Sequence, residues 1–208
     1  MDIPKSGRFD AFSMIVDINR FTALVSEHDL PAGVANFVGD ILAGSISAIE
    51  KSDGSVIGIN GDAIFGVLPT PNAAAEACFL IAKDLDRMCE YLAGSEYEAS
   101  IPCPPTLKIG VELGTLDAST IATRAMGTLP FCIGPATNYA ARILGAGRGN
   151  RCHVGPKAFE AGLGEYMPNA KMRRVRGKAG EPFYGYYHLD MSDIWIEGDP
   201  DDGIYYWG

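Results

Sequence analysis

Two spacings of apolar positions divide the chain into predicted strands and predicted helices. Short apolar runs predict strands over residues 11–17, 55–59, 63–68, 107–114 and 151–154, and a closing hairpin over 171–176 and 182–189. A period near 3.6 residues predicts helices that begin near Phe21 and at Pro31, and further helices over 72–93, 135–144 and 156–166. The polar stretch 94–105 predicts a loop, and the pattern in the segment 116–130 gives no clear prediction.

The dipeptide Asn60-Gly61 predicts a tight hairpin between two of these strands, because both central positions of such a turn need a positive φ. The elements then follow the order strand, two helices, hairpin, helix, strand, helix, strand, helix, hairpin. Strand-first units with hairpins and helices on one face are typical of an α+β sandwich of the ferredoxin-like type. This is the fold class that we expect.

Length and composition indicate one folded domain. The chain has 208 residues, of which 47% are hydrophobic, and this is enough for a sizeable core. Residues 190–208 are acidic and aromatic in composition. This tail either folds onto the domain or contacts a partner.

Charge and cysteine content exclude several classes of protein. The formal net charge of -9 argues against a nonspecific nucleic-acid binder, which needs a basic surface. The sequence lacks an apolar run near the roughly 20 residues of a membrane span and an apolar leader, so we expect no membrane partner. The number of cysteines, five, is odd, and no two of them have metal-ligand spacing. We therefore expect reduced thiols, a cytoplasmic location and no zinc site.

Two aspartates are the strongest chemical signal in the chain. Asp17 ends the apolar run 12–16, and Asp62 follows Asn60-Gly61 inside a second apolar stretch. If the two strands are neighbours, the carboxylates converge on one point. Hard divalent cations prefer such oxygen ligands, with coordination sites left for substrate phosphates. A pair of ordinary turn-capping aspartates is the alternative.

Three further features fit chemistry on a nucleoside triphosphate. The residues 18–22 connect a strand to a helix, and main-chain N–H groups at a helix start form an anion site. Asn138 and Arg142 are spaced i, i+4 on one short helix, so they project from one face and suit a ribose oxygen and a phosphate oxygen. Small residues around them, Ala136, Ala140 and Ala141, predict a slim helix that a ligand can approach closely.

Lys178 lies in a glycine-flanked turn, where a cation can reach a terminal phosphate. Each of these features also has an ordinary structural reading, as a strand–helix connection, a solvated helix face or a hairpin tip.

In this order, the pieces resemble the class III nucleotidyl cyclase catalytic domain. The resemblance rests on four segments, VDINRFT (16–22), GDAIF (61–65), IGPATNYAAR (133–142) and VRGKAG (175–180). It covers residues 10–189, which leaves an N-terminal segment 1–9 and the tail 190–208. The resemblance implies a head-to-tail homodimer with active sites at the interface, and two divalent cations, Mn or Mg, as cofactors.

The resemblance also assigns the site residues. It implies metal binding by Asp17, Ile18 and Asp62 of one protomer. It implies that Asn138 and Arg142 of the other protomer act in catalysis, where Asn138 positions the ribose and Arg142 stabilises charge at the α-phosphate. The positions implied for substrate binding are Phe21, Thr22, Gly58, Phe131 and Lys178. The implied reaction is attack of the ribose 3′-hydroxyl on the α-phosphorus, with pyrophosphate as the leaving group.

The base-reading positions depart from the pattern of purine cyclases. Adenylate cyclases of the family place a Lys, and guanylate cyclases a Glu, four residues before the second metal aspartate, where this chain has Gly58. The second base-reading position, seven residues before the helix Asn, holds Phe131, and Cys132 fits a guanine-type residue only if the register slips by one. Gly58 leaves a gap and Phe131 takes volume from the base pocket, so a pyrimidine fits better than a larger purine base.

These traits, and a catalytic domain without an attached sensor, resemble the stand-alone bacterial pyrimidine cyclases of antiphage defence, which make cyclic UMP or cyclic CMP. We expect UTP as the substrate and cyclic UMP as the product. The alternatives are a CTP cyclase, a guanylate or adenylate cyclase with an atypical pocket, and a noncatalytic nucleotide-binding module.

Overall fold

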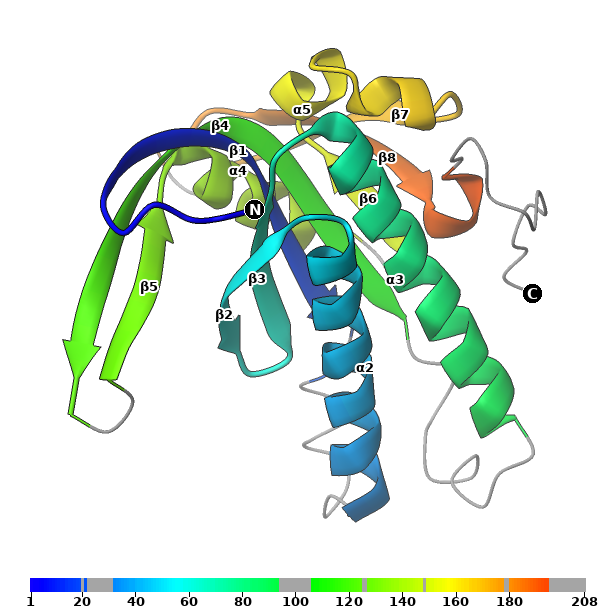
Figure 1. Cartoon of the computed structure of the whole chain (residues 1–208). Coiled ribbons are helices and arrows are strands. Elements are labelled where there is room, and N and C mark those ends of the chain that lie inside the picture. The colour runs from blue at the N-terminus through cyan, green and yellow to red at the C-terminus, as the bar shows by residue number, and fades with distance from the viewer. Residues whose placement is uncertain are drawn as a thin grey trace.

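The computed structural model describes residues 1–19, 21, 32–93, 106–124, 127–147, 149–177 and 180–194. One eight-stranded sheet organises this part of the chain, in the order β2-β3-β1-β4-β6-β8-β7, with β5 paired to β4 (Figure 1). The strands are β1 (Gly7–Ile18), β2 (Ser55–Asn60), β3 (Ala63–Leu68), β4 (Leu107–Thr123), β5 (Gly127–Ile133), β6 (Arg151–Val154), β7 (Lys171–Val175) and β8 (Tyr184–Asp190). Of these pairs, β4–β6 is parallel and the others are antiparallel.

Helices cover both faces of this sheet. The long helices α2 (Ala32–Lys51) and α3 (Pro71–Leu92) lie side by side and pack on one face (Figure 1). The shorter α4 (Pro135–Gly145) packs on β4 from the other face. The chain continues through α5 (Pro156–Glu160) and two short 3-10 turns, η2 (Leu163–Tyr166) and η3 (Met191–Asp193). The predicted α+β class is therefore confirmed. The expectation that the helices lie on one face is wrong, because α4 packs on the face opposite α2 and α3.

Strand alternation decides which face each side chain meets. Met14, Val16, Ile109 and Val111 point into the main core beneath α2 and α3. Successive side chains of a strand point to opposite faces, so Ser13, Asp17 and Gly110 belong to the α4 face. Asp17 therefore lies at the end of β1 on the same face of the sheet as α4.

Glycine lets α4 lie directly on the sheet. A Cβ at Gly110 would lie 2.6 Å from the carbonyl oxygen of Ala140, and one at Gly114 would lie 3.2 Å from the Cβ of Ala136. Both alanines are buried. The prediction that small residues make this helix slim toward a ligand is wrong for Ala136 and Ala140, which face the sheet, whereas Ala141 is exposed.

The structure corrects the position of the hairpin turn. Asn60 is the last residue of β2 and pairs with Ala63, so Gly61 and Asp62 are the two central residues. Gly61 has φ +63°, whereas Asp62 has an ordinary negative φ. A positive φ at the first central position alone is the pattern of a type II′ turn rather than the type I′ turn expected from Asn-Gly.

Two other segments differ from the sequence prediction. The strand predicted over 107–114 continues to Thr123 and returns as β5, so that the segment 116–130 forms most of a projecting two-stranded arm (Figure 1). The helix predicted over 156–166 is broken, because Gly162 adopts a φ of +113° between α5 and η2. The predicted helix after Phe21, the start at Pro31 and the loop 94–105 lie outside the described residues, apart from Phe21.

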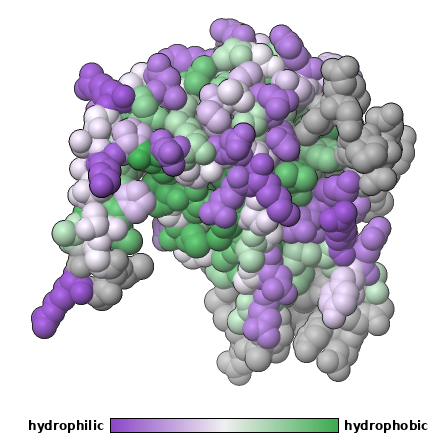
Figure 2. Space-filling view, viewed as in Figure 1, coloured by the Kyte–Doolittle hydropathy of each residue, from purple (hydrophilic) through white to green (hydrophobic). Residues whose placement is uncertain are grey.

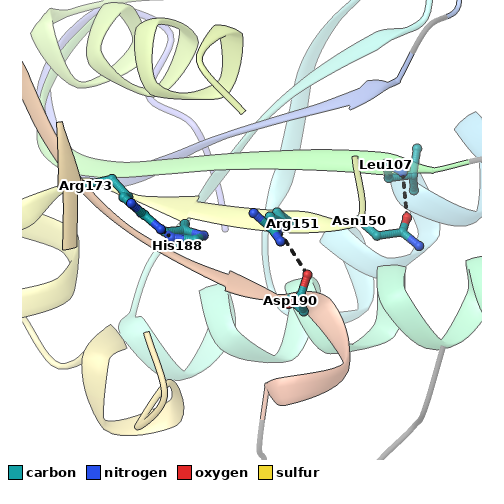
Figure 3. Close-up of polar contacts among 6 residues, drawn as sticks. All are labelled: Leu107, Asn150, Arg151, Arg173, His188 and Asp190. Carbon is teal, nitrogen blue, oxygen red and sulfur yellow. Dashed lines mark hydrogen bonds and ion pairs between the residues drawn. The ribbon is translucent and has the colours of Figure 1, made fainter. Parts of the chain in front are cut away.

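Side chains fasten β6 and its neighbours. Asn150, which has φ +52°, accepts a hydrogen bond at 3.1 Å from the main-chain N–H of Leu107 (Figure 3). Across β6 and β8, Arg151 pairs with Asp190, and Arg173 of β7 donates to His188 (Figure 3). The first contact holds the start of β4 against the turn that leads into β6, and the other two join β8 to β6 and to β7. Met191 and Ile194, after β8, are buried in the main core.

We expect His153 to make stability depend on pH. Its ring is 1% exposed and donates to the carbonyl of Ile109, and burial lowers its pKa to about 4. The unfolded chain binds a proton at this imidazole near pH 6.5. The contribution of the buried neutral ring to the free energy of unfolding is therefore fully present above pH 6.5. It is lost as pH falls toward 4, by up to about 3 kcal/mol.

Urea denaturation at several pH values measures this effect. The variant His153→Gln keeps a donor for Ile109 but carries no titrating group, so its free energy of unfolding should fall less steeply between pH 6.5 and 4. An identical slope for the wild type and the variant would contradict the prediction.

Among the described residues, none of the helices is long and apolar enough to cross a membrane.

Candidate active site

The register of the sheet brings the two predicted metal aspartates to one end of the molecule. Asp17 of β1 pairs with Ala63 of β3, the residue directly after Asp62. Asp62 occupies the second central position of the β2–β3 turn. The strand ends are therefore neighbours, as the sequence pattern required.

The electrostatics of Asp62 depend on its burial and on its neighbour Asp17. Burial raises the pKa of Asp62, and the charge of Asp17 and a side-chain hydrogen bond with Asp17 raise this pKa further. A hydrogen bond from its own main chain and the charge of Lys108 act in the opposite direction. A neighbouring like charge disfavours the ionised form of Asp62, and a nearby cation favours that form.

A cation does lie beside them. Lys108 pairs with Asp17 across β1 and β4, and its Nζ lies 2.7 Å from Oδ2 of Asp17. Both side chains are largely buried, at 14% and 21% exposed. No local pattern in the sequence marks Lys108 as a site residue. It lies 91 positions after Asp17, and only the register of β1 against β4 makes the two residues neighbours.

The residues present fit a divalent cation such as Mg or Mn. Asp17 and Asp62 supply hard carboxylate oxygens, and the position of Lys108 shows that a positive charge is accommodated there. Ile18 has a buried apolar side chain, so only its main-chain carbonyl is a candidate ligand. Within the described residues, no group of three or more His, Cys, Asp or Glu side chains gathers. A small set of protein ligands leaves coordination sites for phosphate oxygens.

Helix α4 carries the second group of candidate residues. Asn138 is exposed, whereas Arg142 is partly buried and its Nη2 lies 2.6 Å from Oε1 of Glu181. Tyr139, between them, donates a 2.7 Å hydrogen bond to the carbonyl of Gly185 in β8. On the β1 side, the hydroxyls of Ser13 and Thr137 lie 3.3 Å apart. The helix is thus tied to β1, β4 and β8, and this limits the movement of its two polar residues.

The positions expected to read the base lie on neighbouring strands, since β2 and β5 contact each other. An added Cβ at Gly58 meets nothing within 4 Å, so the position is open. Phe131 is 40% exposed, whereas Cys132 is 5% exposed and packs in an apolar cluster with Leu116 and Ala136. The buried thiol of Cys132 does not favour a role in base recognition. We therefore keep Phe131, seven residues before Asn138, as the predicted second base-reading position.

Two predicted substrate-binding residues, Thr22 and Lys178, lie outside the described residues. Phe21 is described and packs against the main core. Before it, Asn19 binds Thr106 through both its main-chain N–H and its side-chain amide. Glu181 was also missed by the sequence analysis, because no local pattern marks an acid in a hairpin as the partner of a helix arginine.

Comparisons with solved structures support this description of the fold. The guanylyl cyclase Cya2 superimposes with a TM-score of 0.75 at 16% identity, covering 94% of this chain and 98% of that chain. The adenylyl cyclase CyaB from P. aeruginosa gives a TM-score of 0.66 at 16% identity, covering 90% and 97%. A non-canonical dimeric guanylyl cyclase domain of the RhoGC fusion protein from the aquatic fungus Blastocladiella emersonii gives a TM-score of 0.63 at 14% identity, covering 88% and 97%. At these identities, the likeness concerns the fold.

The sequence itself supplies the family. No curated protein matches the chain by sequence. The family model described as "Adenylate and Guanylate cyclase catalytic domain" matches residues 5–187, nearly the whole chain. The chain therefore belongs to the adenylate and guanylate cyclase catalytic domain family, the class III nucleotidyl cyclases.

Proposed function

We propose that this protein is a pyrimidine nucleotidyl cyclase, a phosphorus–oxygen lyase that converts UTP to cyclic UMP and pyrophosphate at a homodimer interface. The observation that carries the cyclase assignment is the placement of Asp17 and Asp62 at adjoining strand ends, with the ammonium of Lys108 beside Asp17. Such an arrangement suits an ion that itself holds a polyphosphate. Degenerate relatives of an enzyme have no reason to keep both acids.

The residues divide the work of the reaction. The ribose 3′-oxygen bonds to the α-phosphorus, the bond from that phosphorus to the β-phosphate oxygen breaks, and the hydroxyl proton leaves to solvent. When bound, divalent ions lower the pKa of the hydroxyl and neutralise the phosphates. Asn138 orients the ribose, and Arg142 stabilises the charge that develops on the α-phosphate. Lys178 and the segment at Phe21 and Thr22 bind the remaining phosphates.

A second copy of the chain completes the site in this proposal. One protomer contributes Asp17, Ile18 and Asp62, and the other contributes Asn138, Arg142 and Lys178. The arm formed by β4 and β5 carries exposed apolar side chains, Ile121, Phe131 and Ile133, and Figure 2 shows apolar surface in the hollow beside it. Exposed apolar patches of this kind mark association surfaces. The domain from B. emersonii is described as a non-canonical dimer, which supports association of such domains but not the head-to-tail arrangement in particular.

The pair Gly58 and Phe131 supports a pyrimidine. At Gly58, a side chain that would reach a purine edge is missing and the space is open. At Phe131, a bulky and partly exposed ring stands at the position that the resemblance assigns to base reading. The smaller uracil ring fits such a site better than a purine, and we place CTP second.

Incubation with each of the four nucleoside triphosphates and Mn tests the proposal. We expect cyclic UMP and pyrophosphate from UTP, resolved by chromatography, and little product from ATP or GTP. Cyclic CMP as the main product would select the cytidylate alternative, and a cyclic purine nucleotide would overturn the pyrimidine assignment. Nucleotide binding without pyrophosphate release from any substrate would identify a noncatalytic module.

Replacing Phe131 by Thr should relax the preference against purines. The smaller side chain frees volume at the base, so the ratio of kcat/KM for ATP to that for UTP should rise by about 10-fold or more. The matched control is Met172→Thr, which also shortens an exposed apolar side chain, on the distant strand β7. An unchanged ratio in Phe131→Thr would remove this residue from the base-reading set.

We further propose that the cyclic pyrimidine nucleotide is an alarm signal in antiphage defence, on the resemblance of the base-reading positions to those of the stand-alone pyrimidine cyclases. Cells that express the protein should accumulate cyclic UMP after phage infection, as measured by mass spectrometry of extracts. Cells that express the Asp62→Asn variant should not.

A further inference from the structure

The contact between Arg142 and Glu181 links α4 to the connection between β7 and β8. The 2.6 Å distance from Nη2 to Oε1 joins two side chains that are each 28% exposed. The Nε of Arg142 is buried and has no hydrogen-bond partner among the described residues. Glu181 therefore binds one nitrogen of the guanidinium and leaves the Nε donor of the same planar group without a partner in the described part of the chain.

The main chain around Glu181 is itself held in place. A Cβ at Gly177 would lie 2.5 Å from the carbonyl oxygen of Pro182 and 2.6 Å from the Cβ of Glu181. The two sides of this connection are thus packed against each other with no space for a side chain. On the other side of the ion pair, the hydrogen bond from Tyr139 to the carbonyl of Gly185 fixes α4 to β8 close to Arg142. The main chain at Arg142 and at Glu181 is therefore held by contacts with neighbouring segments.

We propose that Glu181 is a positioning residue for Arg142, and this inference rests on the proposed function. A carboxylate that binds one nitrogen of a guanidinium fixes the plane of the group, and the remaining N–H donors then point in set directions. With Glu181 in place, Arg142 meets the α-phosphate of the substrate in one orientation. In this proposal, Glu181 touches neither substrate nor metal, and its effect on catalysis passes through Arg142.

The variants Glu181→Ala and Glu181→Gln test this role. Loss of the carboxylate lets the arginine sample other rotamers, so kcat for Glu181→Ala should fall by about 10- to 100-fold while KM changes little. Glu181→Gln keeps a hydrogen-bond acceptor and should lose less. The control is Glu165→Gln, an exposed acid on η2, whose kcat should match the wild type.

A double-mutant cycle separates positioning from a general structural effect. In the Arg142→Ala background, Glu181→Ala should cause no further loss of kcat, because the residue it orients is gone. Losses in kcat that multiply in the double variant would overturn the proposal. A kcat for Glu181→Ala equal to that of the wild type would also overturn it. A kcat above that of the wild type would overturn it as well and would indicate that Glu181 restrains Arg142. The same cycle on the urea midpoint measures the coupling of the pair without catalysis. A wild-type protein that makes no cyclic nucleotide contradicts the proposed function, whereas an active wild type with an equally active Glu181→Ala contradicts only this inference.

Discussion

The variant Asp17→Asn is expected to lose cyclic nucleotide production, with kcat reduced at least about 10³-fold. The amide keeps the shape of the side chain but removes one negative charge from the pair with Asp62. It also removes the charge that the Nζ of Lys108 contacts at 2.7 Å. An amide oxygen binds hard divalent cations much more weakly than a carboxylate does. Chromatography of the products and a pyrophosphate assay measure the loss.

Two controls separate this loss from unfolding. Asp117→Asn changes an aspartate on β4 that forms an exposed ion pair with Arg8, and its activity should remain that of the wild type. The urea transition of Asp17→Asn should remain cooperative, although loss of the ion pair with Lys108 lowers its midpoint. Mn should raise the melting temperature of the wild type and of Asp117→Asn but not that of Asp17→Asn. Full activity in Asp17→Asn would refute the assignment of the metal site.

Mixing two inactive variants examines the shared site. If Asp17 and Arg142 of different protomers meet, a heterodimer of Asp17→Asn with Arg142→Ala contains one intact site and one doubly altered site. After exchange of subunits at equal concentrations, about a quarter of the wild-type activity should return. No recovery, together with demonstrated subunit exchange, would place all of the catalytic residues within a single protomer.

The second large effect is expected from Gly110→Ala, although Gly110 contacts no substrate in the proposed site. The added Cβ would lie 2.6 Å from the carbonyl oxygen of Ala140 and 2.9 Å from the Cβ of Leu144, so α4 has to move away from β4. Overpacking of this kind typically costs about 1–3 kcal/mol of stability. A shift of about 1 Å in a helix that carries Asn138 and Arg142 should also reduce kcat by about 10²-fold. Urea denaturation and product assays on the same sample measure both effects.

A graded series makes this test specific. At Gly114, the nearest atom to an added Cβ is the Cβ of Ala136 at 3.2 Å, so Gly114→Ala should cause a smaller change in the same direction. At Gly39, in α2, nothing lies within 4 Å of an added Cβ, and alanine is the better helix former. Gly39→Ala should therefore keep or raise stability and leave kcat unchanged. Equal effects at all three positions would contradict the role of the α4 contact.

The features that the sequence predicted well are those with a local cause. The apolar period defined α3 to within one residue at each end, and β6 over 151–154 was predicted without error, because burial on one face repeats every few positions. The placement of Asp17 and Asp62 at the ends of apolar strands was equally readable, since each acid directly follows or interrupts a run of core residues. The positive φ values of Gly61 and Gly162 set the position of the β2–β3 turn and the break after α5. At these two positions the prediction from the sequence was less accurate.

Other features depend on which strands become neighbours, and only the tertiary structure decided them. Lys108 meets Asp17 because β1 and β4 pair in one particular register, and Glu181 meets Arg142 because a hairpin far along the chain folds over α4. The projecting arm of β4 and β5 was missed because its exposed residues have no core face to impose a period. By itself, then, the sequence determined the strands, most of the helices and the residue types of the site. The tertiary structure decided their pairing and their charged partners, because contacts between distant segments leave no periodic trace in the chain.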